Sequence, residues 1–480
     1  MTDHLETVAP TVHSTPPARP PEFDAATHAT MAHIDGQAVK VVAEKRRAST
    51  RKGNAQDGAS RAGRPWRLLT LGANPLTRVS FAVILAELYR TGVLQRRFEL
   101  HQFVLDPGVD GQRPEQVDDV RLHWGGNEPD STARLRKVMA DVRPDVVLLV
   151  GEIGHFMQLG SVLAETHLPV LGWFPVNFER ITNPRPWQIV LSVCTRVLCQ
   201  SEFGARQLRR DNPNVAVLPL GVNTEVFTPI GSRDQRALRT ELGWDSTGFL
   251  FLFVGRNNSR KGVHFAIEAF RLFRALDPAA GDASYLYLHT DVDHRLLELL
   301  HGSDLLDRVC LTDDYDIVRN FLSETQLADL YRASDVFLLP SLSEGFGMPL
   351  LEAQAAGLPI IATDNSAITE VVGDAGLLID APLRIPALDS DCIAWARPPD
   401  VDHAARLMLS LYHDAPLRSG LGERGIARAA SQTWKAIADA LLNELTHLTP
   451  TALERRWRSD RSRVEVDRAA PATGGVRADS

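Results

Sequence analysis

Residues 249–275 read FLFLFVGRNNSRKGVHFAIEAFRLFRA and pass from an apolar strand through a basic turn into a helix. The first six residues are apolar without alternation, which is typical of a parallel strand covered on both faces. From Val263 onward the apolar residues recur at helical spacing. Strand, short loop and helix together form the repeating unit of α/β proteins, so this stretch predicts a parallel sheet flanked by helices.

The same alternation continues on both sides of this stretch. The second half predicts a helix near 233–242 and strands at 249–255, 284–290, 307–312, 335–341, 358–363 and 376–380. The first half predicts strands at 66–72, 98–105, 145–151, 168–174, 196–200 and 215–220. Open parallel sheets bind ligands beyond the carboxyl ends of their strands. We therefore expect two Rossmann-like domains whose sheets face a central cleft, with the functional site in that cleft.

The chain divides into two domains and two tails. Residues 1–64 are rich in Ala, Pro, Thr and Arg and predict a disordered arm, because they cannot bury enough apolar surface to offset the entropy lost on ordering. Residues 65–222 would form the N-terminal domain and residues 223–433 the C-terminal domain. A helix at 434–449 is expected to return to the first domain, and 450–480 to form a flexible tail.

Composition excludes several classes of protein. The net charge of −8, from 52 basic and 60 acidic residues, does not favour nucleic acid as a partner. The four cysteines form no CxxC pair, which favours a reduced compartment. No apolar segment approaches the roughly 20 residues that span a bilayer, and the first residues do not resemble a signal peptide. We therefore expect a cytoplasmic protein.

The turn between the strand and helix at 249–275 is suited to an anion. Arg256, Arg260 and Lys261 supply positive charge, while Gly255 and Gly262 allow a ligand close to the backbone. The N-terminus of the following helix also favours negative charge. The spacing fits neither a P-loop nor a dinucleotide fingerprint, so the prediction is a phosphate site of another kind, with a solvated basic turn as the alternative.

A second motif, EGFGMPLLEA at 344–353, follows the strand expected at 335–341. Pro349 suits the first turn of a helix and Gly357 its C-terminal end. Glu344 would lie in the loop and Glu352 about one turn inside the helix, so both carboxylates can face one ligand. Carboxylates accept hydrogen bonds from vicinal hydroxyls and repel phosphate, which indicates a sugar-binding role.

These two motifs, with LPLGVNTEVF at 218–227, resemble the retaining nucleotide-sugar glycosyltransferases of family 4, which have the GT-B fold. The resemblance extends from about residue 66 to 448 and is densest in the second half. It implies a nucleoside diphosphate sugar as donor, with UDP favoured over GDP. It also implies transfer of a hexose to a hydroxyl acceptor with retained configuration, and without metal or cofactor. The DxD-like pairs at 291/293 and 389/391 are therefore not expected to hold a cation.

The resemblance also assigns roles to individual residues. Arg256 and Lys261 would hold the diphosphate and stabilise the charge that develops on it. Glu344 would bind hydroxyls of the transferred sugar, and Glu352 the ribose. The remaining donor-binding candidates are Gly345, Phe346, Gly347 and Met348 around the sugar and phosphate, and Thr312 and Asp314 near the base.

Loops after strands of the first half are expected to line the acceptor side. Their candidates are Arg78 and Ser80 in the first loop and His155 in the second, where His155 could orient the acceptor or a donor phosphate. In the third, WFPVN resembles a subgroup that has Asp where this chain has Asn177, so a possible carboxylate is missing. A small metabolite, a natural product, a lipid and a glycan all stay open as the acceptor.

Two other functions share these features. A nucleotide-sugar epimerase of GT-B fold would convert the donor without an acceptor, and a non-catalytic nucleotide-sugar binding protein would bind it without turnover. The basic helix at 135–142 could contact anionic lipid, but a single helix without a large apolar face does not favour membrane contact.

Overall fold

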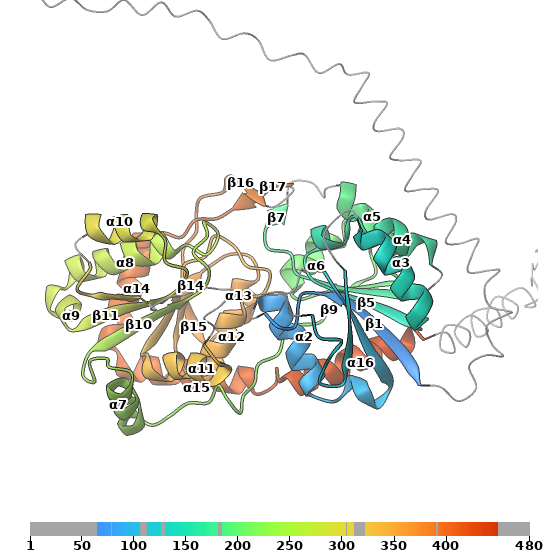
Figure 1. Cartoon of the computed structure of the whole chain (residues 1–480). Coiled ribbons are helices and arrows are strands. Elements are labelled where there is room, and N and C mark those ends of the chain that lie inside the picture. The colour runs from blue at the N-terminus through green and yellow to red at the C-terminus, as the bar shows by residue number, and fades with distance from the viewer. Residues whose placement is uncertain are drawn as a thin grey trace, which may run out of the picture.

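The computed structural model describes residues 65–77, 79–105, 113–125, 130–166, 168–180, 185–303, 305–311, 322–389 and 392–449. The arm expected at 1–64 and the tail expected at 450–480 lie outside these residues, as do Arg78, Thr312 and Asp314. Two α/β domains lie next to each other, each with a central sheet between helices (Figure 1). This is the two-sheet architecture that the alternation of strands and helices predicts.

The N-terminal domain contains an eight-stranded sheet in the order β3-β4-β2-β1-β5-β6-β8-β9. Every pairing in it is parallel except that between β3 and β4. Its central strands are buried over most of their length, as their continuous apolar sequence predicts. The strands are β1 (Trp66–Gly72), β2 (Phe98–Val104), β3 (Gln116–Val117), β4 (Val120–Trp124), β5 (Val146–Val150), β6 (Val170–Phe174), β8 (Arg196–Cys199) and β9 (Val215–Val217). The helices are α2 (Ser80–Arg90), η2 (Leu94–Arg96), α3 (Ser131–Val142), η4 (Ile153–Phe156), α4 (Gly160–Glu165), α5 (Arg185–Val193) and α6 (Glu202–Leu208).

The C-terminal domain contains a six-stranded, fully parallel sheet in the order β12-β11-β10-β13-β14-β15. Its strands are β10 (Phe249–Val254), β11 (Ser284–His289), β12 (Val309–Leu311), β13 (Val336–Leu339), β14 (Ile360–Thr363) and β15 (Gly376–Ile379). Its helices are α7 (Ser232–Glu241), α8 (Val263–Leu276), α9 (Pro278–Asp282), α10 (His294–Gly302), α11 (Glu324–Ala333), α12 (Met348–Ala355), α13 (Ile368–Val372), α14 (Val401–His413) and α15 (Ala415–Ala429).

The last described helix, α16 (Trp434–His447), lies against the N-terminal domain although it follows the C-terminal one (Figure 1). The backbone of Trp434 passes so close to Gly221 that a Cβ there would lie 2.7 Å from the Trp434 nitrogen. Farther along the helix, both carboxylate oxygens of Glu444 accept hydrogen bonds from Arg196 on β8, at 2.9 and 3.0 Å. The chain therefore crosses between the domains twice.

Some strands were not expected from the sequence. The pair β3 and β4 adds an antiparallel edge to the first sheet, and β7 (Glu179–Arg180), β16 (Ile385–Asp389) and β17 (Cys392–Ala396) form a three-stranded antiparallel sheet. Strand β7 belongs to the N-terminal domain, so its pairing with β17 connects the two domains. The two-residue strands β3 and β7 are too short to show a periodicity, and the pairing of β7 with β17 arises only when the domains meet.

Candidate functional site

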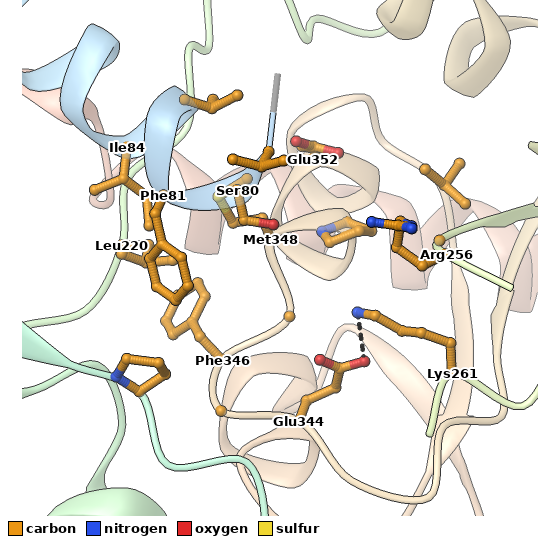
Figure 2. Close-up of a pocket in the computed structure, with 18 of the residues that line it drawn as sticks. Ser80, Phe81, Ile84, Leu220, Arg256, Lys261, Glu344, Phe346, Met348 and Glu352 are labelled. Carbon is orange, nitrogen blue, oxygen red and sulfur yellow. Dashed lines mark hydrogen bonds and ion pairs between the residues drawn. The ribbon is translucent and has the colours of Figure 1, made fainter. Parts of the chain in front are cut away.

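The cleft between the two domains contains a pocket of about 330 Å³. The N-terminal domain contributes the start of α2 and the loops after β5 and β6, and the C-terminal domain contributes the loops after β10 and β13. Figure 2 shows Ser80, Phe81, Arg256, Lys261, Glu344, Phe346, Met348 and Glu352 around it. The pocket thus lies at the carboxyl ends of strands from both sheets.

The basic turn places two cations against the loop that follows β13. Gly262 has φ 73°, and a Cβ there would lie 2.3 Å from the carbonyl oxygen of Pro340, so only glycine fits. Arg260 donates through Nη1 to the Ser343 carbonyl at 2.8 Å and to the Glu344 carboxylate at 2.6 Å. Close packing of the turn on this loop therefore brings the two sequence motifs together.

Glu344 is at the centre of this arrangement. Its Oε1 accepts from Lys261 Nζ at 2.7 Å and from the Ser341 hydroxyl at 2.9 Å, and its backbone N–H donates to Ser366 at 2.9 Å. The residue is only 3% exposed. Burial alone would raise the pKa of Glu344, but the charges and hydrogen bonds of Arg260 and Lys261 lower it to about 2. Glu344 is therefore an ionised carboxylate held by two cations.

The second glutamate has a different environment. Glu352 lies inside α12, which begins after Gly347 in a left-handed conformation with φ 94° and has Pro349 in its first turn. Its carboxylate accepts a hydrogen bond from the Tyr331 hydroxyl at 2.7 Å. Burial raises the pKa of Glu352 to about 7, and the nearby Glu324 acts in the same direction. The two glutamates therefore titrate at widely separated pH values, and Glu352 is partly protonated near neutral pH.

Arg256 and the aspartates near it form a separate group at the edge of the pocket. Arg256 lines the pocket and donates through Nε to Asp291 at 2.8 Å, while half of its side chain is exposed. Asp293 accepts from the backbone N–H of Leu296 at the start of α10. In the DxD-like pair, Asp291 therefore forms an ion pair with Arg256, and Asp293 caps the N-terminus of α10. Within the described ranges, no group of three or more His, Cys, Asp or Glu side chains is arranged to hold a metal ion.

The predicted donor-side residues Gly345, Phe346, Gly347 and Met348 all line the pocket. On the acceptor side, Ser80 and Asn177 line it as well. His155 does not: it is exposed in η4, where its ring meets the edge of Phe81 with the ring centroids 6.1 Å apart. The other candidates, Arg78, Thr312 and Asp314, lie outside the described residues.

The pocket lining also includes residues to which the sequence analysis gave no individual role, among them Arg260, Glu152 and His289. Arg260 belongs to the basic turn and was noted there, but its contact with Glu344 depends on packing. Glu152 follows the end of β5, where a loop residue is expected to face the cleft, and its Oε1 accepts from Asn177 Nδ2 at 3.2 Å. His289 lies at the end of β11 and lines the pocket, where burial lowers its pKa to about 4.

The basic helix considered for lipid contact is α3. Its Arg136 makes two hydrogen bonds to Glu165, at 2.9 and 2.8 Å, so part of its charge is paired within the protein. In the part of the chain that the structure describes, no helix combines the length and apolar content needed to cross a membrane.

Comparison with known proteins agrees with the geometry of the C-terminal domain. A family model described as Glycosyl transferases group 1 matches residues 248–392, which contain both the basic turn and the two glutamates. This segment is a glycosyl transferase group 1 domain. The pocket residues from β10, β13 and α12 all belong to this glycosyltransferase domain.

Curated relatives of this chain include D-inositol 3-phosphate glycosyltransferases from two organisms. That of Stackebrandtia nassauensis is 30% identical over 276 residues, which is 56% of this chain and 57% of the relative. That of Segniliparus rotundus is 30% identical over 316 residues, or 61% of this chain and 63% of the relative. The chain thus spans between half and two thirds of the length of these relatives.

Solved structures match nearly the whole of the described chain. Sucrose-phosphate synthase from Thermosynechococcus elongatus has a TM-score of 0.64 at 18% identity, covering 80% of this chain and 99% of that structure. HepE from Anabaena, solved in complex with UDP-glucose, has a TM-score of 0.59 at 14% identity. The match covers 79% of this chain and 99% of that structure. The two domains together therefore have the GT-B fold.

Proposed function

We propose that this protein is a retaining glycosyltransferase that moves a hexose from a nucleoside diphosphate sugar, UDP in preference to GDP, to a hydroxyl acceptor without a metal ion. The observation that carries the proposal is the cluster of Lys261, Arg260 and Glu344 in the interdomain pocket. Two cations and a carboxylate at one point can bind a phosphate and a sugar hydroxyl together. The UDP-glucose bound in HepE supports a uridine donor.

The cations would perform the electrostatic work of the reaction. As the bond between the anomeric carbon and the diphosphate oxygen breaks, its electron pair passes to the oxygen, and the new negative charge develops on the phosphate. Lys261 and Arg256 would stabilise that charge in a partly dehydrated site, where fixed charges act more strongly than in water. The acceptor oxygen then forms the new bond to the anomeric carbon and loses its proton to the departing diphosphate.

Glu344 would position the donor rather than attack it. Its carboxylate is already hydrogen-bonded to Lys261, Arg260 and Ser341, which disfavours a role as nucleophile. It can still accept a hydrogen bond from a sugar hydroxyl beside these partners, because a carboxylate has about four acceptor positions. Glu352 would accept the ribose hydroxyls from inside α12.

Lys261 provides the direct test. The purified protein would be incubated with UDP-, GDP- and ADP-sugars and a set of hydroxyl acceptors, with products measured by mass spectrometry. Replacing Lys261 with Ala should reduce transfer at least about 100-fold, which is the order of loss for one transition-state donor. The exposed Lys435, which pairs with Asp439 in α16, supplies the control variant Lys435→Ala.

The same assay separates the alternatives. An epimerase would convert the donor sugar without acceptor, and a non-catalytic binding protein would bind UDP-sugar and release no nucleotide. Transfer by Lys261→Ala at the wild-type rate would overturn the proposal.

A further inference from the structure

The pocket has two chemically different sides. Figure 2 shows Arg256, Lys261 and Glu344 on one side, and Phe81, Leu220 and Phe346 on the other. The charged side accounts for a diphosphate sugar. The apolar side offers no charge to hold a diphosphate, so it suits an uncharged ring.

The apolar side is built mainly by the N-terminal domain. Phe81 and Ile84 are three residues apart on α2 and therefore lie on one face of that helix, directed toward the pocket. Leu220 comes from the segment after β9, and Phe346 reaches across from the loop after β13. Phe346 is 5% exposed and Leu220 is 2% exposed, whereas the ring of Phe81 is only partly buried. An apolar molecule packed against Phe81 would gain from removing this surface from water.

A carboxylate lies on the same domain's side of the pocket. Glu152 lines the pocket together with Asn177, whose amide donates to it at 3.2 Å. Among the described residues that the N-terminal domain contributes to the pocket there is no Lys or Arg. A carboxylate accepts hydrogen bonds from hydroxyl groups and repels phosphate. Glu152 also supplies, from the neighbouring loop, the negative charge that Asn177 lacks.

Resting on the proposed function, we propose that the acceptor is an uncharged hydroxyl compound with an apolar ring body. The ring packs on Phe81, and Glu152 and Asn177 receive polar groups of the acceptor. An acceptor that carries a phosphate is selected against, because it would place a second anion beside Glu152. This chain would then differ in acceptor from the relatives named D-inositol 3-phosphate glycosyltransferases.

The test measures acceptor binding to the full chain saturated with UDP. Naphthylethanol serves as the neutral aromatic alcohol and D-inositol 3-phosphate as the phosphorylated polyol, each titrated by calorimetry. We expect saturable binding of naphthylethanol and at least about tenfold weaker binding of inositol phosphate. Phe81→Ala should weaken naphthylethanol binding about tenfold by removing apolar contact area. Leu276→Ala, an exposed apolar residue at the end of α8, is the matched control and should change neither affinity.

A second variant tests the charge. Glu152→Gln keeps the shape of the side chain and its contact with Asn177 but removes the negative charge. The ratio of the affinity for naphthylethanol to that for inositol phosphate should therefore fall at least about fivefold. Tighter binding of inositol phosphate than of naphthylethanol to the wild type, or no saturable binding of naphthylethanol, would overturn the inference. UDP affinity is measured in the same samples: its loss would count against the proposed function, whereas intact UDP binding assigns any failure to the acceptor side.

Discussion

At the scale of single residues, the two glutamates of one motif have opposite electrostatic environments. Glu344 is surrounded by cations that hold its pKa at about 2, whereas the half-buried Glu352 is paired with a neutral tyrosine and has a pKa of about 7. A ribose diol binds best to an ionised carboxylate, because only that form offers all its oxygens as acceptors. Donor binding should therefore depend on the protonation of Glu352 and not on that of Glu344.

This difference predicts the pH dependence of donor affinity. Between pH 6 and pH 8 the ionised fraction of Glu352 rises about tenfold, so UDP-glucose should bind about tenfold more tightly at the higher pH. Glu352→Gln cannot titrate, and its affinity should be weaker and flat over this range. Isothermal titration at several pH values checks this, with Glu423→Gln, an exposed residue of α15, as the control. An equal pH dependence in Glu352→Gln and the wild type would contradict the assignment.

The raised pKa also has a consequence for stability. Glu352 binds protons more strongly in the folded chain than in the unfolded one, where a glutamate titrates near its ordinary value of 4.5. The folded state therefore holds the extra proton between about pH 4.5 and 7, and the contribution of this group to the free energy of unfolding falls as the pH rises through that window.

At the scale of elements, the site depends on how closely the start of α8 approaches the end of β13. Gly262→Ala would place a Cβ 2.3 Å from the Pro340 carbonyl oxygen and would also force alanine into a left-handed conformation. Gly243 has nearly the same φ, 72°, but a Cβ at that position would meet no atom within 4 Å, so Gly243→Ala isolates the conformational cost.

We expect Gly243→Ala to lower the free energy of unfolding by about 1 kcal/mol and Gly262→Ala by roughly 3 kcal/mol or more. Only Gly262→Ala should also weaken UDP binding, since it displaces Lys261 and Arg260. Denaturant unfolding and UDP titration of both variants provide the measurements. Equal effects of the two substitutions would show that the close approach is unimportant.

At the scale of the whole molecule, several contacts hold the two domains around the pocket. Strand β7 pairs with β17, Ser343 donates to the Asn177 carbonyl, and Arg384 pairs with Glu179 at 2.7 Å. In addition, the carboxylate of Glu370 accepts the backbone N–H groups of Glu202 and Phe203, both at 3.0 Å, and so caps α6 of the opposite domain. A carboxylate at a helix N-terminus also interacts favourably with the helix dipole.

Removing this cap should loosen the closed arrangement of the domains. Glu370→Ala is expected to lower stability by about 1 kcal/mol and to increase the radius of gyration of the protein without ligand. Thermal unfolding and small-angle scattering with and without UDP-glucose measure these changes, and Glu423→Ala is the control. A radius of gyration unchanged by Glu370→Ala would mean that the remaining contacts suffice to keep the domains together.

The fold class and the two motifs of the site can be predicted from local patterns in the sequence. Apolar strands without alternation, followed by helical periodicity, are local properties, and they predicted the strands at 249–255 and 335–341 and the loops after them. The glycines and charged residues of these loops also predicted a site that binds an anion and a sugar. The two-residue strand β7 was missed because it exists only through its pairing with the distant β17.

Which side chains meet in the pocket depends on tertiary packing. Lys261 and Glu344 are 83 residues apart, and Glu152 and Asn177 come from two different loops. The apolar side of the pocket combines α2 with the loop of Phe346 from the other domain. Such contacts depend on the packing of the sheets and on the angle between the domains, which no local pattern encodes. Local patterns therefore predicted the residues of the charged side of the pocket, and Ser80 and Asn177 across from it, whereas the apolar face with Phe81 emerged only from the packed structure.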